Sequence, residues 1–137
     1  MKQLTVFTDG GARGNPGPAA CAAVVYERLE GVLKKIDSFS KFLGRATNNQ
    51  AEYAAVILAL EKLMPYKEHQ FNFFLDSELV VQQLNGEYKV KDPELGKLFL
   101  KVWNLKAGYQ QITFQHVVRS KNKEADRLVN VELDKAA

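Results

Sequence analysis

The sequence contains few of the residues on which several classes of protein depend. It has one cysteine, Cys21, so no internal disulfide can form, and its strand-like surroundings are typical of a buried structural thiol. No apolar run is long enough to span a bilayer, so we expect no contact with a membrane. Residues 1–3 lead directly into a strand pattern rather than a signal peptide. We therefore expect a cytoplasmic protein.

Neither sign of charge dominates the composition. The net charge is +3, which is compatible with a polyanionic partner without requiring one. Hydrophobic residues make up 46% of the 137 residues and charged residues 26%, a balance typical of globular proteins. A chain of this length has the size of one ordinary domain. We expect residues 1–137 to form a single domain.

The periodicity of the apolar residues predicts the order of strands and helices. Alternation and β-branched residues predict strands at 4–9, 20–26, 32–42, 71–75 and 111–118. Cap residues and the 3.6-residue period predict helices from Asn48 or Asn49 to about 64, from 76 or 77 to about 85, from 93 to 107 and over 121–135. This order indicates an α/β fold, in which an antiparallel meander is extended by two parallel strands and helices cover both faces.

Four acidic residues fall near the ends of these elements. Asp9 and Asp76 end the first and fourth strands, and in open α/β sheets ligands bind at that rim. Glu52 lies in the first turn of the long helix and Asp126 near the start of the last one, and spacing alone does not fix whether they reach the rim. Each acid singly also has a structural interpretation, as a partner of the helix dipole, an N-cap or a surface residue.

If the four carboxylates converge, a positive charge is needed to balance their negative charges. Without a cation, mutual repulsion would raise their pKa values and destabilise the fold. Mg²⁺ prefers oxygen ligands and retains water for contacts with phosphates. Two such ions can activate a water and stabilise the leaving oxygen during cleavage of a phosphodiester.

Four blocks of sequence carry a resemblance to a known family. They are FTDGGARGNPGP from Phe7, TNNQAEYAAVILAL from Thr47, LDSELVVQQL from Leu75 and HVVRSKNKEADRLVN from His116. Together they resemble type 1 ribonuclease H along almost the whole chain. The resemblance implies an RNase H-like sheet of strand order 3-2-1-4-5. It also implies hydrolysis of the RNA strand of RNA·DNA hybrids, leaving 5′-phosphate and 3′-hydroxyl ends.

The same resemblance assigns roles to individual residues. Asp9, Glu52, Asp76 and Asp126 match the four acids that bind two Mg²⁺ ions with substrate bound, and Mn²⁺ is an alternative. The substrate-binding residues implied are Gly10, Gly11, Asn15, Asn48 and Asn49 for the minor groove, with Arg45 and Thr47 for a phosphate of the DNA strand. The glycines and asparagines can serve in turns and caps at the same time.

One catalytic position stays open between two residues. Some family members use a histidine in a flexible loop near the last acid. Here His116 is in phase with the apolar residues of the last strand, so it is either that histidine or a structural residue. Arg119 is the competing candidate for a cation near the scissile phosphate.

The chain departs from the longer family members between Gly86 and Asp92. Those members insert a helix and a basic protrusion there, so this chain resembles the short form, and we expect weaker binding of hybrids. Two alternatives to a hybrid-specific enzyme remain: a catalytically silent nucleic-acid-binding module of the same fold, and a nuclease that also cleaves double-stranded RNA. We expect a monomer.

Overall fold

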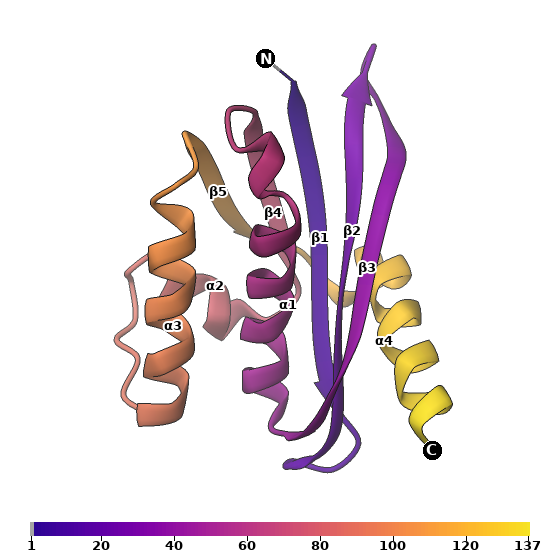
Figure 1. Cartoon of the computed structure of the whole chain (residues 1–137), viewed down its shortest axis with the longest axis vertical. Coiled ribbons are helices and arrows are strands. Elements are labelled where there is room, and N and C mark those ends of the chain that lie inside the picture. Colours follow the sequence, from indigo (N-terminus) through magenta and orange to yellow (C-terminus); the bar gives the residue numbers. More distant parts are fainter. Residues whose placement is uncertain (1) are drawn as a thin grey trace.

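The computed structural model describes residues 2–137 and contains one five-stranded sheet between helices (Figure 1). The strands are β1 (Gln3–Ala12), β2 (Gly17–Leu29), β3 (Val32–Ala46), β4 (Gln70–Leu75) and β5 (Gln111–His116). Their order is β3-β2-β1-β4-β5. The first three are antiparallel, whereas β4 is parallel to β1 and β5 is parallel to β4. The predicted fold class and strand order are confirmed.

Four α-helices and two short 3-10 helices connect the strands. They are α1 (Asn48–Lys62), η1 (Met64–Tyr66), α2 (Glu78–Leu84), α3 (Pro93–Lys106), η2 (Arg119–Lys121) and α4 (Lys123–Ala136). Residues 85–92, between α2 and α3, form no helix, in agreement with the expected short form. Across the described residues, no helix is both long and apolar enough to cross a membrane.

The alternation of side chains along β2 shows how the two faces of the sheet are covered. Ala23 and Val25 belong to the main core beneath α1. Ala20 and Ala22 point to the other face and pack against Val129 of α4. Because side chains two residues apart share a face, this small-residue stripe lets α4 lie close to the strand.

The register between β1 and β4 places two acids beside each other. The last paired residues are Thr8 and Leu75, so Asp9 and Asp76 both follow directly after the last pair. The prediction that the first strand ends at Asp9 is wrong, because pairing with β2 continues to Ala12. Strand β1 pairs with β4 only as far as Thr8, whereas its pairing with β2 continues beyond Asp9.

Thr47 caps α1, which corrects the prediction of Asn48 or Asn49. Its hydroxyl accepts a hydrogen bond from the N–H of Gln50 (3.1 Å), whose side chain accepts one from the N–H of Thr47 (2.9 Å). This reciprocal capping box satisfies two N–H groups at the helix start. The two asparagines therefore lie inside the first turn, and their side chains are left for other contacts.

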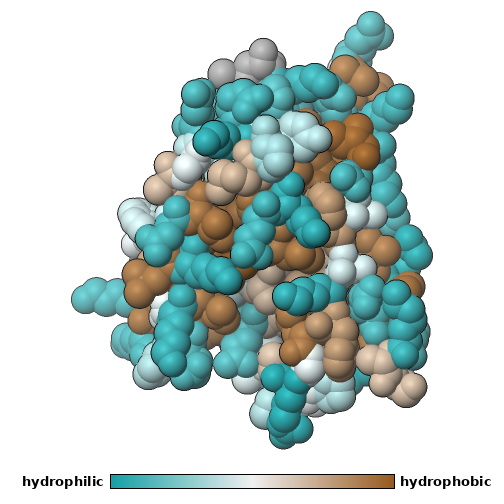
Figure 2. Space-filling view, in the orientation of Figure 1, coloured by the Kyte–Doolittle hydropathy of each residue, from teal (hydrophilic) through white to brown (hydrophobic). Residues whose placement is uncertain are grey.

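The outer surface of α3 is only partly apolar. Val102 is buried, whereas Leu100 and Trp103 are 59% and 56% exposed. Trp103 stacks on Phe99 and lies beneath the ammonium group of Lys106. Figure 2 shows apolar side chains interrupted by hydrophilic ones on this face of the molecule.

Candidate active site

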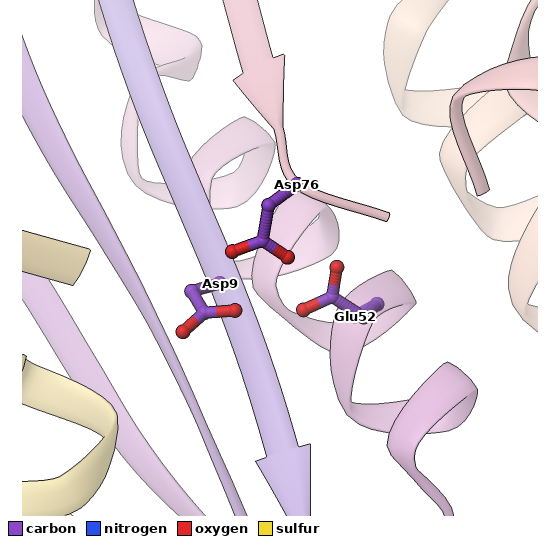
Figure 3. Close-up of side chains that lie close together, drawn as sticks. All are labelled: Asp9, Glu52 and Asp76. Carbon is purple, nitrogen blue, oxygen red and sulfur yellow. The ribbon is translucent and has the colours of Figure 1, made fainter. Parts of the chain in front are cut away.

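Three carboxylates from three different elements meet at one point. Asp9 lies on β1, Glu52 on α1, and Asp76 directly after β4. One carboxylate oxygen from each lies within 4.8 Å of the others. Figure 3 shows all three side chains pointing toward a common centre. The strand register described above brings the two aspartates together, and α1 supplies the glutamate.

Asp126 lies at the edge of the same cavity, in the first turn of α4. It is not part of the three-carboxylate cluster found among the described residues. Its side chain is 35% exposed, and its Oδ1 lies 3.6 Å from Nη2 of Arg119. The arginine is itself 81% exposed, so this ion pair is weakly held and leaves both groups accessible.

The cavity has a volume of about 330 Å³ and collects most of the residues that the sequence indicated. Those that line it are Asp9, Gly10, Gly11, Asn48, Asn49, Glu52, Asp76, Arg119 and Asp126. Four predicted site residues do not line it: Asn15, Arg45, Thr47 and His116.

A close approach between β1 and α1 positions Glu52. The N–H of Gly10 donates a hydrogen bond to Oε1 of Glu52. A Cβ on Gly10 would overlap the carbonyl of Ala51, so only glycine permits this approach. The prediction that Glu52 lies in the first turn is wrong, because α1 begins at Asn48 and has no acid in that turn. The strand, rather than the helix dipole, holds this carboxylate.

Burial makes the apo form of this cluster costly to ionise. Desolvation and then the charge of Asp76 raise the pKa of Asp9 from 3.8 to about 7. Desolvation, followed by the charge of Asp9, raises the pKa of Glu52 well above its ordinary value. Both shifts follow from burial and from the like charges that the fold places together.

The donor set fits a hard divalent cation. All the ligand atoms offered are carboxylate oxygens, which Mg²⁺ and Mn²⁺ favour. Oε2 of Glu52 is buried and, among the described residues, has no hydrogen-bond partner. Buried polar atoms are nearly always partnered, so an orphaned oxygen inside a carboxylate cluster is consistent with a ligand atom for a cation.

The asparagines tie the glycine-rich turn to the start of α1. Oδ1 of Asn48 accepts a hydrogen bond from the N–H of Ala12 (2.9 Å), and Oδ1 of Asn15 accepts one from the N–H of Asn48 (3.0 Å). Each side chain thereby uses its oxygen within the fold. The amide N–H groups of Asn15 and Asn48 make no hydrogen bond within the described part of the chain.

The remaining predicted residues, Arg45, Thr47 and His116, do not line the cavity. Arg45 is exposed near the end of β3, and Thr47 follows it two residues later with its hydroxyl engaged in the capping box. His116 is exposed at the end of β5, opposite Leu75. That strand ends at His116 rather than at 118 as predicted, because Val118 already caps η2.

Two residues near the carboxylates surround Asp76: Ser77, which the sequence already offered as a cap together with Asp76, and Asn122, which it did not indicate. Ser77 caps α2 through its hydroxyl (3.3 Å to the N–H of Val80), so Asp76 is not the cap and its carboxylate is left for the cavity. Asn122 is buried and donates a hydrogen bond to Oδ2 of Asp76 (3.1 Å). An asparagine at the start of the helix that carries the last acid was the only signal for it.

Comparison with known proteins agrees with this geometry. Residues 7–131 match a family model described as "Reverse transcriptase-like". The chain is 38% identical over 134 residues to a ribonuclease HI of Halobacterium salinarum, covering 98% of the chain and 66% of that protein. It is also 38% identical over 135 residues to the "Bifunctional protein Rv2228c" of Mycobacterium tuberculosis, of which it spans only 36%. The chain thus covers about a third of some of its curated relatives.

Solved structures show the same relationship in three dimensions. The crystal structure of LC11-RNase H1 in complex with an RNA/DNA hybrid has a TM-score of 0.90 and 40% identity, covering 97% of this chain and 98% of that one. RNase H1 of Halobacterium salinarum gives a TM-score of 0.89 at 37% identity, covering 97% and 98%. Sequence and fold therefore agree, and the chain belongs to the type 1 ribonuclease H family.

Proposed function

We propose that this chain is a metal-dependent endoribonuclease that hydrolyses the RNA strand of RNA·DNA hybrids. The observation that carries the proposal is the meeting of Asp9, Glu52 and Asp76 within 4.8 Å, with Asp126 at the edge of the same cavity. The complex of LC11-RNase H1 with an RNA/DNA hybrid supports the choice of substrate. The alternative of a silent binding module does not explain why the fold clusters three acids, whose mutual repulsion lowers its stability.

The four acids would hold the cation in this proposal. Asp9, Glu52 and Asp76 supply oxygens from rigid elements, and Asp126 supplies another from the more exposed side. When bound, two Mg²⁺ or Mn²⁺ ions supply the water activation and charge stabilisation that in-line cleavage of a phosphodiester needs. The carboxylates themselves need only be fixed in position and ionised.

The phosphorus–oxygen bond that breaks determines which chemical groups the ends of the RNA products carry. A hydroxyl derived from water forms the new bond to phosphorus, and the bond between phosphorus and the 3′ oxygen breaks. The products therefore carry a 5′-phosphate and, after protonation of the leaving oxygen, a 3′-hydroxyl. Arg119 is the side chain we assign as the cation beside the scissile phosphate, because it lines the cavity and His116 does not.

The asparagines are suited to contact the minor groove of a hybrid. An A-form-like duplex displays its 2′-hydroxyls in a wide, shallow minor groove. Asn15, Asn48 and Asn49 offer amide N–H donors near the cavity, and Gly10 and Gly11 add no side chain that would keep a backbone away. We further propose that Arg45, which is exposed near the end of β3, binds a phosphate of the DNA strand.

The carboxylates all come from one chain, so we propose that residues 1–137 act as a single domain and as a monomer. No second copy is required to complete the cavity.

A cleavage assay on matched duplexes tests the proposal. Labelled RNA·DNA, RNA·RNA and DNA·DNA duplexes are incubated with Mg²⁺, with Mn²⁺ and with chelator, and the ends of the products are analysed. We expect metal-dependent cleavage of the RNA strand of the hybrid, with 5′-phosphate ends. Binding of the hybrid without any cleavage would favour the silent module. Equal cleavage of RNA·RNA would show that activity extends to double-stranded RNA.

A further inference from the structure

Asn122, the residue that precedes α4, contacts the segments of three of the four acids. It is 1% exposed. Its Nδ2 donates hydrogen bonds to the carbonyl of Thr8 (2.8 Å) and to Oδ2 of Asp76 (3.1 Å). Its backbone carbonyl accepts a hydrogen bond from the N–H of Asp126 (3.1 Å). Because Thr8 directly precedes Asp9, one residue joins the middle of β1 and the end of β4 to the start of α4.

Capping of α4 does not explain the orientation of the Asn122 side chain. An asparagine at an N-cap usually accepts a hydrogen bond from an N–H of the first turn through Oδ1. In α4 the cap makes no such bond, and Oδ1 of Asn122 is buried with no partner among the described residues. The side chain makes no capping hydrogen bond and leaves Oδ1 without a donor, whereas its Nδ2 donates two hydrogen bonds.

An amide is suited to orient a carboxylate that must also bind a cation. Repulsion from Asp9 and Glu52 favours rotation of the half-buried Asp76 toward solvent when nothing holds it. A lysine or arginine at this place would hold it but would also neutralise the charge that attracts the cation. A neutral N–H donor fixes the carboxylate and leaves that charge intact.

We propose that Asn122 is a positioning residue for cation binding, whose side-chain amide holds the Asp76 carboxylate in the orientation that faces Asp9 and Glu52 (Figure 3). The inference rests on the proposed function, because it assumes that these acids bind a divalent cation. Asn122 does not line the cavity, so it acts through Asp76 and not by touching the substrate.

Replacement of the side chain tests this role with a readout other than activity. Mg²⁺ binding to the intact chain is measured by calorimetry for wild type and Asn122→Ala, together with kcat and KM for a hybrid at several Mg²⁺ concentrations. We expect Mg²⁺ binding to weaken by about 10-fold to 100-fold, as is typical when the partner of a metal ligand is removed. KM for the hybrid at saturating Mg²⁺ should stay within about twofold of wild type, because a buried side chain contacts no substrate.

Asn85→Ala is the matched control. Asn85 also donates a side-chain hydrogen bond to a strand carbonyl, that of Phe114 (3.1 Å), but it does not line the cavity. It should lose stability while its Mg²⁺ affinity stays unchanged. If Asn122→Ala has the same Mg²⁺ affinity as Asn85→Ala, the positioning role is wrong. If wild type neither binds Mg²⁺ nor cleaves hybrids, the proposed function itself fails.

A measurement on wild type keeps the proposal testable if Asn122→Ala does not fold. The two side-chain amide protons of Asn122 are observed by NMR during titration with Mg²⁺. We expect slow exchange with solvent before titration and a change in chemical shift as Mg²⁺ binds, because their acceptor Asp76 changes its charge environment. Binding of Mg²⁺ without any change at these protons would overturn the role.

Discussion

The N–H of Gly10 donates a hydrogen bond to Oε1 of Glu52, so strand β1 holds the acid of α1 at the cavity. We expect Gly10→Ala to lose this arrangement, because the new Cβ would overlap the carbonyl of Ala51. Overpacking of this kind costs about 1–3 kcal/mol, and here the backbone itself must move. Urea unfolding should show the loss of stability, and hybrid cleavage should fall with it.

Gly11→Ala is the control for stability. A Cβ on Gly11 would meet only Cγ1 of Val129 at 3.9 Å, an ordinary contact. Its free energy of unfolding should stay within about 0.5 kcal/mol of wild type, as is usual for substitutions without a specific clash. Equal destabilisation of the two variants would contradict the close approach of β1 and α1.

Removal of charge from the cluster should abolish turnover without unfolding the protein. In Asp9→Asn and Asp76→Asn the cation loses a ligand, whereas the side-chain volume is unchanged. We expect losses in kcat greater than the roughly 100-fold that the loss of an outer partner costs. Asp37→Asn, on β3 and away from the cavity, should retain wild-type rates. Near-normal turnover in either cluster variant would show that the ligands are misassigned.

Stability in chelator should fall as the pH rises from about 4 to about 7. The pKa of Asp9 is raised from 3.8 to about 7, so in that window the folded state binds more protons than the unfolded state. This contribution is complete below pH 4 and is lost as the pH passes 7. The expected loss is on the order of a few kcal/mol, since one pKa unit corresponds to about 1.4 kcal/mol.

Unfolding in urea at a series of pH values measures how the free energy of unfolding changes with pH, which is the slope of the stability profile. Asp9→Asn should flatten it and be more stable than wild type at pH 8. Hydrogen bonds with Arg127 and Lys35 lower the pKa of Glu124 from 4.5 to about 2, so this group changes stability between these two values and overlaps only the lower edge of the window. A profile that rises steadily from pH 4 to pH 8 would contradict the raised pKa.

Mg²⁺ should restore the stability that is lost at high pH. A ligand at 100 times its dissociation constant stabilises a folded protein by about 2.7 kcal/mol. Because protons compete with the cation for Asp9 and Glu52, the increase in Tm should be larger at pH 8 than at pH 5. Thermal unfolding with Mg²⁺ and with chelator measures the increase in Tm at each pH. Asp9→Asn should show a much smaller increase in Tm.

The sequence was sufficient to predict the sheet, whereas spacing alone could not show that Glu52 joins Asp9 and Asp76, because packing decides that contact. Alternation and helix periods define the strands and helices, and four long motifs identify the family. Residue spacing could not show that Glu52 is held by Gly10, since the contact joins residues 42 positions apart. The choice of Thr47 as the cap depends on a reciprocal bond with Gln50. The role of Asn122 was hidden because an asparagine before a helix is usually explained as a cap.

Arg119 and His116 can be separated by their positions. Arg119 lines the cavity with its guanidinium 3.6 Å from Asp126, whereas His116 lies at the end of β5 outside the cavity. A hydrogen bond to a charged group contributes about 1.5–3 kcal/mol, and the high exposure of Arg119 favours the low end. Arg119→Ala should therefore lower kcat for a hybrid about 10-fold. His116→Ala should change it by less than about twofold, because the side chain lies outside the cavity. A larger loss in His116→Ala than in Arg119→Ala would reverse the assignment and would require the end of β5 to move so that the histidine reaches the substrate.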